Sequence, residues 1–355
     1  MTRFAWVFVL CILVAFVAYA KGPVAPSPED VSTGYAEPIL SQWGLDVVTW
    51  TTVASSPQLL GRSGSGVIGN YFYCFGGEPG NFAVAFNLTT QQWEASTPPP
   101  LPQDNWCGVV ADGSLYLIGR YDPYGAGYGS EIQKFTPTGG GPTGTWTTVA
   151  NYPIAACGIG AAYDGNDIIY AAGGNPSPTS AYKYSISSNT WTAIASLPIS
   201  MAYTGGAFVN GKFYVYGGTT QPAANSLYEY NPATNAWTQK ANVPTTVWFA
   251  TFSTTYNDGL VMSIGGGGGY GSWPATDAVQ LYDPATDTWT QETPLPIALG
   301  ANSARWAGAG VVISAGGYSG SAYTGTTHRG TDFPGGADPL APAAPTNFTV
   351  SNNGP

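Results

Sequence analysis

Short apolar segments separated by glycine-marked turns recur along most of the chain. The most regular unit has a small-residue apolar segment, a tight Asn-Gly turn, an alternating segment that ends in a glycine pair, and two further short segments. Asn-Gly between alternating segments is a strong hairpin signal. This unit predicts a four-stranded antiparallel meander, with strands and turns at 202–209, Asn210-Gly211, 212–216, Gly217-Gly218, 226–230 and a last strand from Trp237.

The later part of this unit is a segment that returns elsewhere in the chain. In each copy an aromatic residue precedes a tryptophan at a constant spacing, from Tyr230 to Trp237, Tyr282 to Trp289, Tyr184 to Trp191 and Phe86 to Trp93. Self-similarity of this kind predicts a repeat architecture in which each unit packs against its neighbours. We expect the aromatic residue and the tryptophan to fill the space between sheets.

Six such units follow one another, and their first strands are expected at 63–68, 107–111, 158–163, 202–209, 249–254 and 303–307. The tryptophans that mark fourth strands lie at positions 50, 93, 146, 191, 237 and 289. The sixth unit, with its third strand expected near 326–331, has no tryptophan after it, and the strand around Trp50 has no unit before it. We therefore expect the N-terminal strand to complete the last unit, which closes a ring and removes free sheet edges.

Composition supports strands and limits the range of partners. Aromatic residues make up 14% of the chain, which favours strands, whereas 8% charged residues are too few for the outer faces of long helices. The net charge is −10 and offers no basic stripe for phosphates. We therefore expect no nucleic acid partner and no binding to an anionic membrane surface.

Both ends of the chain differ from the repeats. Residues 1–20 combine a short positive start, an apolar run and a small-residue cleavage site, which favour a secretory signal peptide over an uncleaved membrane anchor. We expect an extended leader at 21–45 and a Pro/Ala/Gly linker at 334–345. Residues 346–355 resemble the first strand of a fibronectin type III-like module. These features predict a secreted or cell-surface protein, with a monomeric repeat domain inside a longer multi-domain chain.

Three cysteines follow the predicted signal peptide, at Cys74, Cys107 and Cys157. An odd number leaves at least one thiol free or intermolecular. Cys107 and Cys157 occupy similar places in consecutive units, so a disulfide between them is one interpretation. The other is that all three are small buried hydrophobic residues.

The repeated features together resemble the kelch β-propeller family over residues 46–333: a double glycine after an apolar strand, an aromatic residue and a tryptophan, at intervals of about 43 to 53 residues. Five of the six units keep the glycine pair, and the second has Gly119 alone. The resemblance implies an all-β, six-bladed kelch-type β-propeller whose last blade is closed by the strand around Trp50.

The resemblance leaves function open, because this family includes protein-binding modules, sugar-active enzymes and copper oxidases. Copper oxidases of this fold use two histidines and two tyrosines as ligands, and His328 is the single histidine of this chain. We therefore expect no metal and no other cofactor.

Chemistry is expected on one face, where the loops after the double glycines meet the loops that lead into the innermost strands. Flat aromatic side chains with a few charged neighbours suit sugars, although tyrosine-rich loops also pack simply on themselves. The candidate ligand-binding residues are Arg62, Glu78, Trp106, Arg120, Tyr121, Asp122, Tyr124, Tyr203, Trp248, Tyr270, Trp273, Arg305 and Tyr318, with Tyr128 and Tyr323 beside them.

Two functions are compatible with this face. The first is a secreted, non-catalytic binding or adhesion module that recognises carbohydrate or an extracellular protein. The alternative is a sugar-active enzyme similar to the kelch-type mutarotases that act on sialic acid (N-acetylneuraminate). The resemblance implies that such an enzyme needs an arginine for the substrate carboxylate and an acid/base pair, for which the candidates are Arg62, Arg305 or Arg120 with Glu78 or Asp122.

Overall fold

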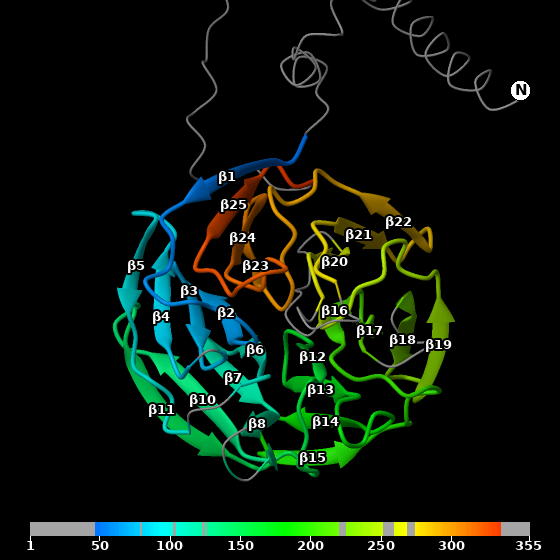
Figure 1. The fold of residues 1–355 in the computed structure, drawn as a ribbon. Coiled ribbons are helices and arrows are strands. Elements are labelled where there is room, and N and C mark those ends of the chain that lie inside the picture. Colours follow the sequence, from blue (N-terminus) through cyan, green and yellow to red (C-terminus); the bar gives the residue numbers. More distant parts are fainter. Residues whose placement is uncertain are drawn as a thin grey trace, which may run out of the picture. The chain divides into compact units, whose positions relative to one another are not determined.

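The computed structural model describes residues 47–78, 80–101, 104–122, 125, 127–219, 225–250, 259–267 and 274–334. The regular elements of these residues are β-strands. No helix in this part of the chain is long and apolar enough to cross a membrane. The strands form radial sheets, or blades, around a common axis (Figure 1). The predicted all-β propeller with six blades is therefore confirmed.

Five blades are four-stranded antiparallel sheets, and in four of them the strands follow one another in the sequence from the innermost to the outermost. Blade 1 contains β2 (Gly64–Ile68), β3 (Tyr71–Phe75), β4 (Ala83–Asn87) and β5 (Gln92–Ala95). Blade 2 contains β6 (Cys107–Ala111), β7 (Ser114–Ile118), β10 (Ile132–Pro137) and β11 (Gly144–Val149). Blade 3 contains β12 (Gly160–Tyr163), β13 (Ile168–Ala172), β14 (Ala181–Ser185) and β15 (Thr190–Ala193). Blade 4 contains β16 (Gly205–Val209), β17 (Lys212–Tyr216), β18 (Leu227–Asn231) and β19 (Ala236–Lys240).

Blade 5 has three described strands, β20 (Val261–Ile264), β21 (Val279–Asp283) and β22 (Thr288–Gln291). Its predicted innermost strand at 249–254 begins with Phe249, which lies in a turn, and residues 251–254 lie outside the described residues. A separate two-stranded ribbon of β8 (Arg120–Asp122) and β9 (Gly127–Gly129) projects from blade 2 and was not predicted.

The last blade is closed by the N-terminal strand. Its order is β23 (Ser303–Gly308), β24 (Val311–Ala315), β25 (Thr327–Thr331) and β1 (Thr49–Val53). Strand β1 lies beside β25 (Figure 1). The two strands are antiparallel, and Trp50 lies opposite Gly330. The predicted ring closure and the predicted third strand near 326–331 are both confirmed.

Each fourth-strand tryptophan ties its blade to the blade before it in the ring. The indole N–H donates to a backbone carbonyl just beyond the neighbour's outermost strand, at donor–acceptor distances of 2.7 to 3.1 Å. The six pairs are Trp50–Thr293, Trp93–Ala54, Trp146–Thr97, Trp191–Ala150, Trp237–Ala195 and Trp289–Ala241. The tryptophans are thus scaffold residues, as predicted, and an apolar cluster fills the space between each pair of neighbouring blades.

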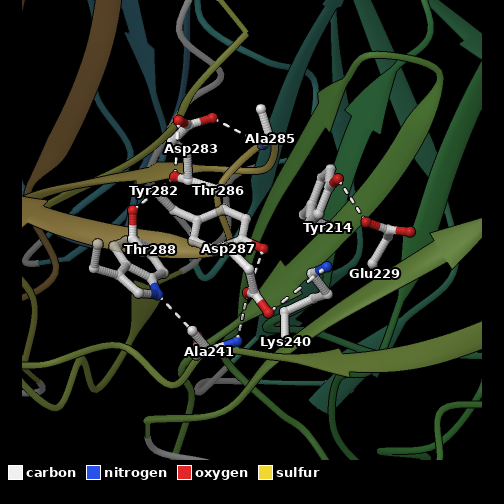
Figure 2. A network of polar contacts seen from close by, with 11 residues as sticks. Tyr214, Glu229, Lys240, Ala241, Tyr282, Asp283, Ala285, Thr286, Asp287 and Thr288 are labelled. Carbon is white, nitrogen blue, oxygen red and sulfur yellow. Dashed lines mark hydrogen bonds and ion pairs between the residues drawn. The ribbon is translucent and has the colours of Figure 1, made fainter.

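The polar residue two positions before some of these tryptophans reinforces the same junctions. Figure 2 shows Asp287, whose Oδ1 accepts hydrogen bonds from the Tyr282 hydroxyl (2.8 Å) and from the backbone N–H of Ala241 in blade 4 (2.9 Å). Asp287 has a φ of 54°, a left-handed conformation that Asp and Asn tolerate better than other non-glycine residues. The repeated chemistry of this turn is therefore structural rather than ligand-binding.

The glycine pairs let the backbone of one segment approach another closely. Gly77 has a φ of 106°, and a Cβ atom there would overlap the carbonyl oxygen of Gly61. In blade 2 the second glycine of the pair is replaced by Arg120, which begins β8. The substitution thus coincides with the start of the extra ribbon.

All three described cysteines are buried free thiols. Burial raises the pKa of Cys107 to about 11 and of Cys74 to about 12. The structure therefore supports the interpretation of the three cysteines as small buried residues, and Cys107 and Cys157 do not form a disulfide.

Candidate functional site

The two loop sets expected on one face lie side by side in the structure. The residue after a glycine pair bonds through its backbone to the segment that leads into the innermost strand of the same blade. Glu78 N–H donates to the carbonyl of Gly61 (2.9 Å), and Tyr318 exchanges two such bonds with Gly300. Backbone pairing therefore holds the two sets at one end of the ring axis.

Six residues with left-handed backbone encircle the axis at this end. They occupy equivalent positions in the six blades, and in five blades this position is two residues before the innermost strand. We call them the axial collar; they are Arg62 (φ 56°), Asn105 (58°), Gly158 (66°), Tyr203 (59°), Phe249 (54°) and Ala301 (52°). Such a conformation is costly for most side chains and is found often at ligand-binding positions.

Backbone hydrogen bonds connect collar residues of neighbouring blades. Arg62 N–H donates to Ala301 O (3.1 Å), and Asn105 N–H donates to Arg62 O (3.0 Å). On the other side of the ring, Tyr203 N–H donates to Gly158 O (2.7 Å). The collar positions are thus set by the scaffold, while their side chains differ from blade to blade.

Collar side chains from different blades meet each other. The rings of Tyr203 and Phe249 have centroids 4.4 Å apart, and the Arg62 guanidinium carbon lies 5.4 Å from the Phe249 centroid. Arg62 belongs to blade 1 and Phe249 to blade 5, which are not neighbours in the ring. These side chains therefore converge on the axis.

A charged cluster adjoins the collar. Arg62 Nη1 lies 3.2 Å from Glu78 Oε2 and 3.8 Å from Asp104 Oδ2. The Tyr323 hydroxyl donates to the same Glu78 oxygen (2.7 Å). The Glu78 side chain is 31% exposed, whereas that of Asp104 is 6% exposed. The cluster thus reaches from solvent into the protein.

Burial raises the pKa of Asp104 from 3.8 to about 6. The guanidinium of Arg62 opposes this rise, and the negative charges of Glu78 and Asp122 add to it. A carboxyl group that titrates near neutral pH beside a guanidinium is a feature of functional sites.

The phenol of the collar residue Tyr203 and the neighbouring thiol of Cys157 are both neutral at physiological pH. The Tyr203 hydroxyl lies 3.4 Å from Cys157 Sγ. Burial raises the pKa of Cys157 to about 12 and also raises the pKa of Tyr203. Because the thiolate is the reactive form of cysteine, this pair offers packing and hydrogen bonding rather than a nucleophile.

The β8–β9 ribbon places Arg120, Asp122 and two tyrosine rings near this cluster, and Glu131 follows the ribbon in the chain. Arg120 Nε donates to Glu131 Oε2 (2.7 Å), and this hydrogen bond lowers the pKa of Glu131. The rings of Tyr121 and Tyr128 have centroids 5.3 Å apart. Backbone bonds in both directions join Tyr121 to Asp104, so the ribbon is attached directly to the charged cluster.

Other candidate residues lie elsewhere. Trp106 is fully buried in the apolar cluster between blades 1 and 2, so its side chain does not reach the loop surface. Arg305 is also buried, and its guanidinium donates to the carbonyls of Ser65, Gly108 and Ala304 on the innermost strands. It therefore braces three inner strands instead of lying on the loop face.

The remaining candidates divide into described and undescribed residues. Tyr318 packs edge-on against Tyr323, with ring centroids 5.4 Å apart, and the carbonyl of Trp248 accepts a hydrogen bond from Gly267 N–H (2.5 Å). Tyr124, Tyr270 and Trp273 lie outside the described residues.

The residues that the sequence prediction missed are Asp104, Asn105, Phe249 and Cys157. The signal that they share in the sequence is their position within the repeat unit. Aligning the units on their innermost strands places Asn105 at the position of Arg62, and Asp104 and Cys157 one residue earlier. Phe249 is placed with them by its φ of 54° and by the bond from Gly267 N–H to the carbonyl of Trp248, the residue before it.

Comparisons with known proteins agree with this architecture. The family model described as "Kelch motif" matches residues 200–244, which include blade 4. No curated protein matches the sequence. A solved structure titled "Structure of YjhT" is similar, with a TM-score of 0.62 and 16% sequence identity over 78% of this chain and 96% of that chain. At that identity the similarity concerns the fold alone. The chain thus contains a six-bladed β-propeller that carries a kelch motif.

Proposed function

We propose that this protein is a secreted or cell-surface binding module that recognises carbohydrate at the axial collar and its charged cluster. The observation that carries the proposal is the convergence of Arg62, Tyr203 and Phe249 from three different blades beside the Glu78 and Asp104 carboxylates. Aromatic faces stack on the C–H faces of sugars, while charged tips bond to hydroxyl groups. A rigid ring that presents irregular loops is a common setting for binding.

A glycan array probed with the intact chain tests this proposal. We expect at least one class of glycan to bind, and Arg62→Ala and Tyr203→Ala each to reduce that binding by about tenfold or more. Tyr163→Ala is the matched control, because Tyr163 ends β12 at the opposite face and bonds to Asp112 in a hairpin turn. Unchanged binding by both collar variants would place the site elsewhere. An array without any bound glycan would refute carbohydrate recognition and favour an extracellular protein partner.

One observation favours the alternative, a sugar-active enzyme similar to the kelch-type mutarotases that act on sialic acid. Asp104 has a pKa of about 6, which suits a general acid or base near neutral pH, and Arg62 lies beside it. Anomeric exchange of N-acetylneuraminate, followed by NMR, tests this function. A rate equal to that of the buffer control would rule this function out. A rate unaffected by Asp104→Asn would rule out Asp104 as its acid or base.

A further inference from the structure

Carboxylates outnumber guanidinium groups around the axial collar. Arg62 is shared between two carboxylates, and Asp122 is close enough to Asp104 to raise its pKa. The described carboxylates of the charged cluster, of the ribbon and of the segment just after it are Glu78, Asp104, Asp122 and Glu131, and the guanidinium groups are Arg62 and Arg120. With all four carboxylates ionised, this region carries an excess of two negative charges.

The Arg62 guanidinium is already engaged by acidic neighbours. It lies 3.2 Å from Glu78 Oε2 and 3.8 Å from Asp104 Oδ2, and it also faces the Phe249 ring. A carboxylated ligand would have to compete with these two carboxylates for the same cation and approach them closely. Like charges brought together in this way disfavour binding. The arrangement therefore selects against anionic ligands.

A buried acceptor at the collar points to a ligand that donates hydrogen bonds. Asn105 is 1% exposed, and its Nδ2 donates to Asp104 Oδ1 (2.9 Å). Its Oδ1 is buried and has no hydrogen-bond partner among the described residues. Buried polar atoms are normally paired, so an open acceptor beside a carboxylate marks a place for an N–H or O–H group from outside the chain.

Aromatic rings lie within the same region. Tyr203 and Phe249 pack together in the collar, and Tyr121 and Tyr128 pack together in the ribbon that bonds to Asp104. Ring faces attract cations as well as the C–H faces of sugars. A protonated amino group on a sugar can contact the aromatic ring faces, pair with the carboxylates and donate a hydrogen bond to Asn105 Oδ1.

We propose that the axial collar and its charged cluster prefer saccharides that carry protonated amino groups, such as glucosamine oligomers, over neutral or carboxylated saccharides. This preference rests on the proposed carbohydrate-binding function and adds the class of ligand to it.

Calorimetric titration of the intact chain tests the preference with three probes at about pH 6.5, where the sugar amines and the Asp104 carboxyl are each charged in a large share of molecules. The probes are a glucosamine hexamer, its fully N-acetylated counterpart and a sialylated trisaccharide. We expect the glucosamine hexamer to bind about tenfold or more tightly than either of the others, and this advantage to shrink as salt is added.

Two variants locate the effect. Glu78→Gln removes the most exposed carboxylate of the cluster and is expected to reduce the advantage of the hexamer about threefold to tenfold. Asp122→Asn, on β8, serves as a second variant, so that a folding defect in one does not decide the test. Glu292→Gln is the control, because Glu292 directly follows the outermost strand of blade 5 and its change removes the same charge from the chain.

The outcomes distinguish failure of the amine preference from failure of carbohydrate binding. Equal or tighter binding of the acetylated or sialylated probe would overturn the amine preference and leave carbohydrate binding in place. If Glu78→Gln and Asp122→Asn both leave the advantage of the glucosamine hexamer unchanged, the assignment of binding to the collar would be overturned. The same holds if Glu292→Gln reduces this advantage as much as they do. Failure of all three probes together with an empty glycan array would refute the proposed function itself.

Discussion

Asp104 is expected to lower the stability of the propeller at neutral pH. Its side chain is 6% exposed, and burial raises its pKa from 3.8 to about 6. A shift of about two units corresponds to about 3 kcal/mol of differential free energy between the two protonation states. Because the folded-state pKa is raised, the contribution is favourable below pH 4 and is lost as the pH rises through 6. Asp104→Asn removes the titrating carboxyl group, so the variant should not lose this stability as the pH rises.

The magnitude can be measured from urea unfolding curves followed by tryptophan fluorescence. We expect Asp104→Asn to be more stable than wild type by about 1–3 kcal/mol at about pH 7.5, because Arg62 keeps its contact with Glu78. Between about pH 7.5 and pH 4.5 the difference should narrow by roughly 2 kcal/mol.

The control is Asp277→Asn, since Asp277 is exposed. Its stability relative to wild type should change little between the two pH values. A difference for Asp104→Asn that stays constant, or that grows as the pH falls, would refute the reasoning. A constant difference would show that the ion pair with Arg62 cancels the cost of burial, and a growing one that it outweighs this cost.

Three further predictions concern the scaffold and use the same unfolding assay. Gly77→Ala should destabilise the protein by more than about 3 kcal/mol, whereas Gly113→Ala, which has open space around its Cβ position, should cost only ~1–2 kcal/mol for the left-handed backbone; equal costs would show that the close approach is not limiting. Asp287→Ala should cost about 2–3 kcal/mol by removing an acceptor used by two donors, and Asp287→Asn, which keeps that acceptor, should cost less than about 1 kcal/mol. Trp289→Phe loses the indole hydrogen bond between blades 4 and 5 and should cost about 1–3 kcal/mol. An unchanged urea midpoint would show that this bond does not contribute to stability.

Much of the fold follows from the sequence because its signals are local and repeated. The spacing of Trp237 and Trp289 from their aromatic partners marks the outer strands, and the missing tryptophan after the sixth unit predicts closure by the strand around Trp50. The β8–β9 ribbon escaped prediction because it occurs in one blade only. Its start at Arg120, where the other units have a second glycine, was visible but had no repeated pattern to interpret it.

The candidate site was predicted less completely, for a physical reason. Arg62 and Glu78 follow from their places in the loops, but the left-handed backbone of Arg62 and Phe249 leaves no mark in residue type, since neither residue favours that conformation. Trp106, one residue beyond the collar, turns into the interface between blades instead of toward the axis. The direction of each side chain depends on a backbone angle that the sequence pattern does not reveal.

The pairing of β1 with β25 has a mechanical consequence. Thr49 lies opposite Thr331, so the chain enters and leaves the ring at adjacent points. A pulling force applied at these two points would load the hydrogen bonds between β1 and β25 one after another, as in a zipper, rather than in parallel. The first blade to yield under tension would be the closing blade, and its loss would open the ring before the other five are strained.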